Sequence, residues 1–167
     1  MTEVTFRGSK VKLEGIFPSV GEKITAFSLC RSDLSDINSR DLEGENIVLS
    51  TFPSLDTPTC AASVRTFNKE VEKLDNTRVL CISADLPFSA KRFCEKEGIE
   101  NVEAVSFFRS PKFAIDYGVL LGEGILRGLS ARATIVVNPQ GRIIHTELVK
   151  ELSQEPNYSL ALNALSA

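Results

Sequence analysis

Two runs of mostly apolar residues stand out in the hydrophobic pattern of the chain. They are residues 46–52 (NIVLSTF) and 78–84 (RVLCISA). The first lies between Gly44 and Pro53. Short apolar runs bounded in this way are typical of strands that are covered on both faces of a sheet. Both segments are therefore predicted to be buried strands.

Other segments predict two hairpins and two further strands. Residues 4–6 (VTF) and 11–13 (VKL) alternate apolar and polar side chains and flank a turn that contains Gly8, and residues 133–138 and 142–148 flank Pro139-Gln140-Gly141. Apolar runs separated by glycine-containing turns are typical of β-hairpins. Residues 24–29 and 102–108 are predicted to be single strands.

A helical pattern follows the first buried strand. The apolar or small residues that form one face of this helix, in steps of four and three, are Cys60, Val64, Phe67, Val71 and Leu74. Such steps match the 3.6-residue period of a helix. Thr57 is a suitable N-cap and Pro58 suits the first helical position, where an N–H group is not needed. Cys60 is therefore expected in the first turn.

Shorter helices are predicted at residues 89–98, 111–118 and 158–165. Gly98 is expected to end the first of them. In the last, Leu160, Leu162 and Leu165 are expected to make the apolar contacts. A strand–helix–strand order followed by a C-terminal hairpin predicts an α/β architecture, with a mixed central sheet flanked by helices and an N-terminal β-hairpin.

Length and charge narrow the class of protein. The chain has 167 residues, of which 43% are hydrophobic and 25% charged, and its net charge is −3. We expect a single domain over residues 1–167 with a sizeable core. The basic residues are scattered, which argues against a nucleic-acid or membrane partner. The charged N-terminal residues do not resemble a secretory signal, so a cytoplasmic location is expected.

The four cysteines are Cys30, Cys60, Cys81 and Cys94. In a reducing compartment, disulfides are rare and mostly catalytic. None of the cysteines forms a Cys-x-x-Cys pair, and the one histidine, His145, lies in a strand-like segment. The closely spaced ligand pairs of a zinc site are missing. We therefore expect neither a metal nor another cofactor.

The position of Cys60 allows two interpretations. A buried cysteine can simply fill space in the core. However, the first turn of a helix presents free N–H groups and the positive end of the helix dipole, which stabilise a thiolate. The neighbours Thr57 and Thr59 are polar, which burial alone does not explain. The pattern favours a reactive thiolate at Cys60.

These residues also resemble a known family. The spacing Pro53-x-x-x-Thr57-x-x-Cys60 is that of the peroxiredoxin active site, and FPSLDTPTCAASVRTFN and LCISADLPFSAKRFC resemble the bacterial thiol peroxidase subfamily. The resemblance extends to GLSARA at 128–133 and to the KELSQEPNYSLAL tail. It implies a thioredoxin-like fold, which the predicted order of elements permits.

The resemblance implies a role for four residues of the active site. Cys60 would be the peroxidatic cysteine, whose thiolate attacks the O–O bond of a hydroperoxide. Thr57 would hydrogen-bond the thiolate and the peroxide, and Pro53 would shield the pocket from water. Arg132 would keep Cys60 ionised and stabilise the leaving oxygen. On the residues alone, a surface ion pair would be the expected fate of Arg132.

The resemblance also implies the second half of the cycle. Cys94 would be the resolving cysteine that forms an intramolecular disulfide with Cys60, although a core position beside Ala90 and Phe93 is equally compatible with its sequence. Thioredoxin would reduce the disulfide, alkyl hydroperoxides would be preferred, and the protein would be a homodimer. Cys81 is expected to be a buried core thiol, and nothing in the sequence assigns a role to Cys30.

Three other functions are alternatives to this interpretation. A dithiol oxidoreductase would need a cysteine where this chain has Ser63, and a glutathione-peroxidase-like enzyme usually carries a tryptophan, which this chain lacks. A redox sensor or chaperone could use the same cysteines without turnover. Only catalytic turnover distinguishes that alternative from an enzyme.

Overall fold

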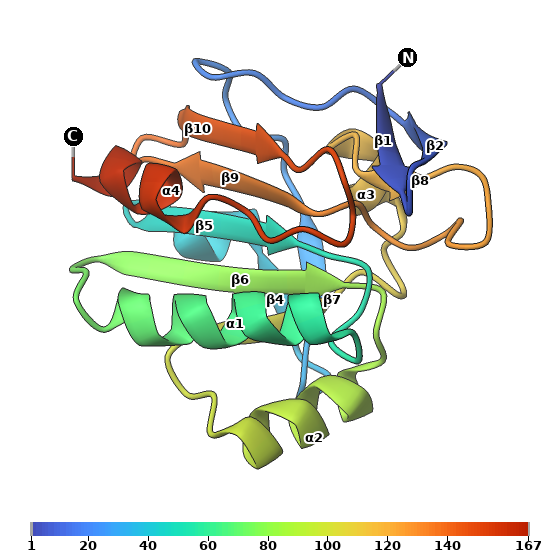
Figure 1. Cartoon of the computed structure of the whole chain (residues 1–167). Coiled ribbons are helices and arrows are strands. Elements are labelled where there is room, and N and C mark those ends of the chain that lie inside the picture. The colour runs from blue at the N-terminus through green and yellow to red at the C-terminus, as the bar shows by residue number, and fades with distance from the viewer. Residues whose placement is uncertain (1, 167) are drawn as a thin grey trace.

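The computed structural model describes residues 2–166 and has a seven-stranded mixed sheet at its centre (Figure 1). The strand order is β10-β9-β5-β6-β7-β3-β4. β5, β6 and β7 run parallel, whereas β9 runs antiparallel to β5 and β10. The strands are β3 (Ser28–Arg31), β4 (Asp36–Asn38), β5 (Asn46–Thr51), β6 (Thr77–Ser83), β7 (Glu103–Ser106), β9 (Ala133–Val137) and β10 (Ile143–Leu148).

Helices and a small second sheet surround this central sheet. The helices are α1 (Pro58–Val71), α2 (Pro87–Glu97), α3 (Lys112–Asp116), α4 (Tyr158–Leu165) and the 3-10 helix η1 (Ser39–Leu42). The second sheet has the order β1-β2-β8, with the strands β1 (Glu3–Phe6), β2 (Ser9–Glu14) and β8 (Leu120–Leu121). Figure 1 shows α1 lying along the front of the central sheet and the β1–β2 hairpin at one end of it.

The core consists of two clusters, one on each face of the sheet. Successive residues of a strand point to opposite faces, so Ile47 and Leu49 of β5 enter one cluster and Val48 enters the other. The first cluster includes residues of α3 and of the N-terminal hairpin. The second includes Cys60 and residues of α1, α2 and α4. The sheet therefore has Cys60 on the face that these three helices cover.

The predicted elements are largely confirmed. α1 starts at Pro58 with Thr57 as its N-cap, and Gly98 ends α2 in the left-handed conformation, at φ 65°. Both hairpins form, and α4 has the predicted bounds. α1 ends at Val71, before Leu74.

Three sequence predictions need correction or addition. The strand predicted at 24–29 begins only at Ser28, because Ile24 hydrogen-bonds Gly141 of the β9–β10 turn and Phe27 is buried without joining a ladder. In α4 the buried residue is Ala161, whereas Leu160 is 54% exposed. The short elements β4, η1 and β8 were not predicted.

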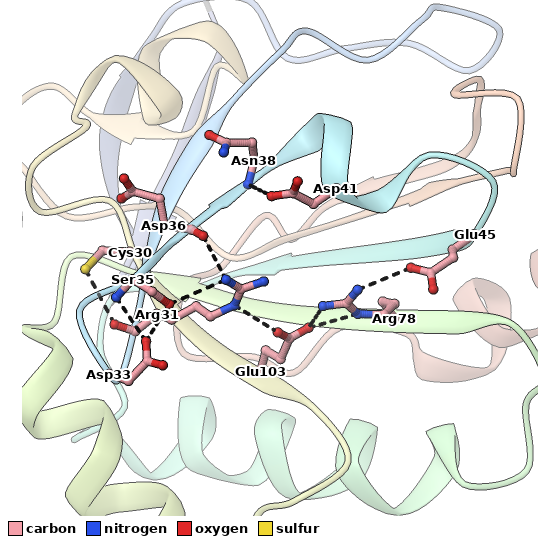
Figure 2. Close-up of polar contacts among 10 residues, drawn as sticks. All are labelled: Cys30, Arg31, Asp33, Ser35, Asp36, Asn38, Asp41, Glu45, Arg78 and Glu103. Carbon is pink, nitrogen blue, oxygen red and sulfur yellow. Dashed lines mark hydrogen bonds and ion pairs between the residues drawn. The ribbon is translucent and has the colours of Figure 1, made fainter.

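A network of charged side chains joins β6, β7 and β3 of the central sheet (Figure 2). Arg78 of β6 donates from Nη2 to Glu103 of β7 at 2.7 Å, and Arg31 of β3 lies 3.5 Å from the same carboxylate. Cys30 is buried beside this network and its Sγ donates to the Arg31 carbonyl at 3.5 Å. Arg78 and Arg31 both pair with Glu103, so the network links β6 and β3 through β7.

Candidate active site

The pairing of β5 with β9 brings Arg132 to the start of α1. Thr51, the last residue of β5, pairs with Ala133, the first residue of β9. Two further hydrogen bonds join the ends of these strands: Thr51 Oγ1 donates to Ala131 O, and Ser130 Oγ to Phe52 O. Since the chain passes from the end of β5 into α1, Arg132 lies beside the first turn of α1.

The start of α1 has the geometry that its sequence predicts. Thr57 is extended, at φ −95° and ψ 144°, and its Oγ1 accepts a hydrogen bond from Cys60 N at 3.3 Å. Pro58 occupies the first helical position. Cys60 is therefore in the first turn, where the dipole of a 14-residue helix favours an anion.

Cys60 and Arg132 form the centre of the site. Arg132 Nη2 donates to Cys60 Sγ at 3.2 Å. The Cys60 residue is 0% exposed and Arg132 is 2% exposed, so water does not screen the contact. Arg132 Nε and Nη2 also donate to the Leu152 carbonyl oxygen. The alternative for Arg132, a surface ion pair, does not hold, because its guanidinium is buried against the Cys60 sulfur.

One donor of the guanidinium has no partner. Arg132 Nη1 is buried and makes no hydrogen bond within the described part of the chain. A buried donor without a partner loses its hydration and gains nothing in return. The site therefore presents a cation with spare hydrogen-bonding capacity beside the thiol, which suits an oxygen that develops negative charge.

Two other predicted site residues lie on the turn between β5 and α1. Pro53 is buried. The Thr57 hydroxyl donates to Ser54 O at 3.2 Å, so it is engaged with the turn as well as with Cys60 N. Shielding by Pro53, and a hydrogen bond from Thr57 to sulfur or peroxide, stay predictions.

Cys94 lies on α2 and packs against the same cluster that contains Cys60 and Cys81. Burial, with a smaller contribution from Glu95, raises the pKa of the Cys94 thiol. Cys81 is 1% exposed, and burial raises its pKa, with a further contribution from Cys94. All four cysteines are free thiols in the described residues.

A groove of about 420 Å³ separates α1 from α2. Thr57 and Ala61 of the α1 region form one wall, and Phe93 and Arg92 of α2 lie on the other. A larger cavity of about 930 Å³ lies at the opposite end of the sheet, beside Ile47 and the β9–β10 turn. The smaller groove therefore borders Thr57, the N-cap of the helix that carries Cys60.

The raised pKa values of Cys81 and Cys94 predict a loss of stability at alkaline pH. The unfolded chain releases thiol protons near pH 8.5, whereas the folded chain retains them, so the free energy of unfolding should fall as the pH rises above about 8.5. Urea unfolding at neutral and alkaline pH measures this fall. A Cys81→Ala variant should show a smaller fall, and an unchanged slope would contradict the assignment to Cys81.

Sequence reasoning missed the two backbone carbonyl groups that hold Arg132 and the first turn of α1. Leu152 and Ser153 act through their backbone carbonyl groups, so the side chains of these two residues give no sign of the contacts.

Among residues 2–166, no helix combines the length and apolarity that crossing a bilayer requires. The same residues contain no cluster of three or more His, Cys, Asp or Glu side chains placed to hold a metal.

Comparisons with known proteins give matches over nearly the whole chain. The Redoxin family model matches residues 19–162. The chain is 47% identical to thiol peroxidases from Vibrio cholerae serotype O1 (97% of this chain and 99% of the relative) and from Corynebacterium glutamicum (99% and 100%). A crystal structure of a peroxiredoxin-like protein from Aquifex aeolicus superposes with a TM-score of 0.94, at 35% identity, over 99% of this chain and 96% of that one.

The fold and the relatives thus lead to one family. The superposition confirms the predicted thioredoxin-like fold, with its mixed central sheet flanked by helices and an N-terminal hairpin. The relatives match almost from end to end, so the resemblance is not confined to the cysteine motif. The chain belongs to the redoxin family and, within it, to the thiol peroxidases, which are enzymes of the peroxiredoxin type.

Proposed function

We propose that the chain reduces hydroperoxides through the thiolate of Cys60. The sulfur attacks the outer oxygen of the hydroperoxide, the O–O bond breaks, and the alcohol leaves after taking up a proton. Cys60 is oxidised to a sulfenic acid, while the peroxide is reduced. The observation that carries the proposal is the 3.2 Å contact between Arg132 Nη2 and Cys60 Sγ in a buried site.

Three side chains assist this step. Arg132 stabilises the thiolate, and its free Nη1 is available to the leaving oxygen. Thr57 is at the N-cap, where its hydroxyl can turn toward a bound peroxide. Pro53 is buried in the turn that precedes α1, and its proposed role is to limit the entry of water.

Cys94 completes the cycle as the resolving cysteine. Its thiol condenses with the sulfenic acid of Cys60, which forms the disulfide and releases water. Cys60 is on α1 and Cys94 on α2, and a disulfide needs Cα atoms about 4.4–6.8 Å apart, whereas packed helix axes lie about 8–10 Å apart. The first turn of α1, the Cys94 segment of α2, or both must therefore unwind locally.

The unwinding can be tested by crystallography of both redox states. We expect the oxidised protein to differ from the reduced one around residues 57–62, around Cys94, or in both places. The sheet and α4 should superpose between the two states. Reduced and oxidised structures that superpose at both cysteines would contradict this step.

The remaining parts of the proposal concern substrate and partners. Apolar groups of Leu55, Ala61 and Phe93 line the groove next to Thr57, which suits the organic part of an alkyl hydroperoxide. Thioredoxin is the proposed reductant of the disulfide, and a homodimer in the cytoplasm is the proposed working form. The chain is proposed to act as one domain without a cofactor, and Cys30 and Cys81 are not needed for turnover.

Cysteine mapping tests the proposed function directly. Reduced protein is mixed with one equivalent of cumene hydroperoxide, free thiols are blocked, and the digest is analysed by mass. We expect a Cys60–Cys94 disulfide, with Cys30 and Cys81 free. Oxidation of Cys60 alone would remove Cys94 from the cycle, and four intact thiols would contradict the peroxidase.

Steady-state turnover separates an enzyme from a redox sensor or chaperone. With thioredoxin, thioredoxin reductase and NADPH, we expect many equivalents of hydroperoxide to be consumed for each protein molecule. A single equivalent followed by arrest would favour the sensor.

A further inference from the structure

The segment after β10 contacts both members of the Cys60–Arg132 pair. The Leu152 carbonyl accepts from Arg132 Nε and Nη2, at 3.2 and 3.0 Å. The next carbonyl, of Ser153, accepts from Thr59 Oγ1 at 3.2 Å, in the first turn of α1. Two consecutive carbonyl groups thus hold the cation and the helix start that carries the thiol. We call residues 149–154 the clamp loop.

The carboxylate of Glu151 holds the clamp loop with both of its oxygens. Oε2 accepts from the backbone N and the Oγ of Ser153, at 3.0 and 2.8 Å. Oε1 accepts from Gly8 N at 3.0 Å and from Thr5 Oγ1 at 3.2 Å. Glu151 therefore fixes the turn of the loop and joins it to the N-terminal hairpin.

Backbone hydrogen bonds extend this joint. Thr5 N donates to Lys150 O at 2.6 Å, and Leu152 N donates to Thr5 O at 2.9 Å. Figure 1 shows the chain turning back from the end of β10 toward α4, close to the N-terminal hairpin. The segment that carries the Leu152 carbonyl is therefore fixed to β1, which is distant from it in the sequence.

The chemistry of Glu151 suits this role. Hydrogen bonds from the backbone N–H groups of Ser153 and Gly8, and from the Ser153 hydroxyl, lower the pKa of Glu151 to about 2. An ionised carboxylate only accepts hydrogen bonds, so it can serve these three donors and Thr5 Oγ1 as well. An amide in its place would offer one accepting oxygen and an NH₂ group that cannot accept.

The guanidinium of Arg132 depends on this loop for its orientation. Its other hydrogen-bond partner is the sulfur of Cys60, and Nη1 makes no hydrogen bond within residues 2–166. A neutral carbonyl orients the guanidinium without cancelling its charge. The full positive charge is therefore directed at the sulfur.

We propose that Glu151 is a positioning residue for the Cys60–Arg132 pair. By ordering the clamp loop, it holds Leu152 O against the guanidinium and Ser153 O against the first turn of α1. Glu151 does not touch the sulfur and acts through these two carbonyl groups. The inference rests on the proposed role of Cys60 as the nucleophile.

The test compares Glu151→Ala and Glu151→Gln with Glu3→Gln in the full chain. Glu3 lies on the N-terminal hairpin that Glu151 contacts, and it pairs with the exposed Lys10 at 3.0 Å. Glu3→Gln therefore removes one negative charge, as Glu151→Gln does, but away from the clamp loop. Two quantities are measured on reduced protein: the rate constant with cumene hydroperoxide, and the pH dependence of Cys60 alkylation by iodoacetamide, followed by peptide mass. Thermal unfolding is recorded in parallel.

Glu151→Ala should react with the hydroperoxide about tenfold more slowly, because small misplacements of a catalytic group are costly. Its Cys60 alkylation profile should move to higher pH, since the thiolate loses its oriented cation. Glu151→Gln should lie between it and the wild type, because one accepting oxygen remains. Glu3→Gln should leave both quantities unchanged.

Two outcomes would overturn the proposal: wild-type values of both quantities in Glu151→Ala, or a slower reaction that follows thermal stability alone with an unmoved alkylation profile. The failure of the proposed function would look different. Wild-type Cys60 would then be inert to hydroperoxide, whereas the alkylation profiles of the variants would still report on positioning.

Discussion

Replacement of Cys60 by serine should abolish hydroperoxide reduction, with a loss of at least about a thousandfold, because serine offers no thiolate at neutral pH. The substitution removes the atom that receives oxygen and leaves the rest of the site in place. Cys60 is fully buried, and serine is close to it in volume, so the fold should persist. Consumption of cumene hydroperoxide by the reduced protein measures the loss.

Two other cysteines provide matched controls for this substitution. Cys30 and Cys81 are each 1% exposed, so their replacement also places a different group in a buried position. Cys30→Ser and Cys81→Ser proteins that remain folded should keep the wild-type rate. A large loss in either variant would show that Cys60 is not the only thiol that turnover needs. Residual activity in Cys60→Ser would show that another residue reacts with the hydroperoxide.

The placement of Cys60 could be predicted because its determinants are local. A threonine, a proline and an apolar period of four and three residues suffice to start α1 at Pro58. The same holds for Gly98 at the end of α2, where a left-handed residue is required. Such signals lie within a few residues of the position that they fix.

The placement of Arg132 could not be derived in this way. Its burial beside Cys60 depends on the antiparallel register of β5 and β9, which pairs Thr51 with Ala133. Nothing in the neighbourhood of Arg132 specifies that register, so only the family resemblance singled this arginine out. The structure supplies the physical reason for that choice.

Glu151 was missed for the same kind of reason. Its partners Thr5 and Gly8 come from the other end of the chain, and its influence passes through backbone carbonyl groups.

The strand predicted at 24–29 begins late because of a contact that is also distant in the sequence. Ile24 hydrogen-bonds the β9–β10 turn and does not join a ladder. Long-range pairing is thus the information that this sequence does not display in its local pattern.

Arg132 should show the second largest effect on catalysis. The guanidinium is buried, contacts Cys60 Sγ, and is oriented by the Leu152 carbonyl. An Arg132→Gln variant loses the charge that stabilises both the thiolate and the leaving oxygen. The rate constant with hydroperoxide should fall about 10²–10³-fold, as for the loss of a donor to a developing anion.

Arg132→Lys separates the charge from the geometry. A lysine keeps the positive charge but lacks the planar fork that donates to Leu152 O from two nitrogens and to sulfur at the same time. If charge alone matters, Arg132→Lys should react nearly as fast as the wild type. If the oriented fork matters, as the contacts indicate, it should be closer to Arg132→Gln. Single-turnover kinetics of all three reduced proteins decides between these results, and a wild-type rate in Arg132→Gln would remove Arg132 from the reaction.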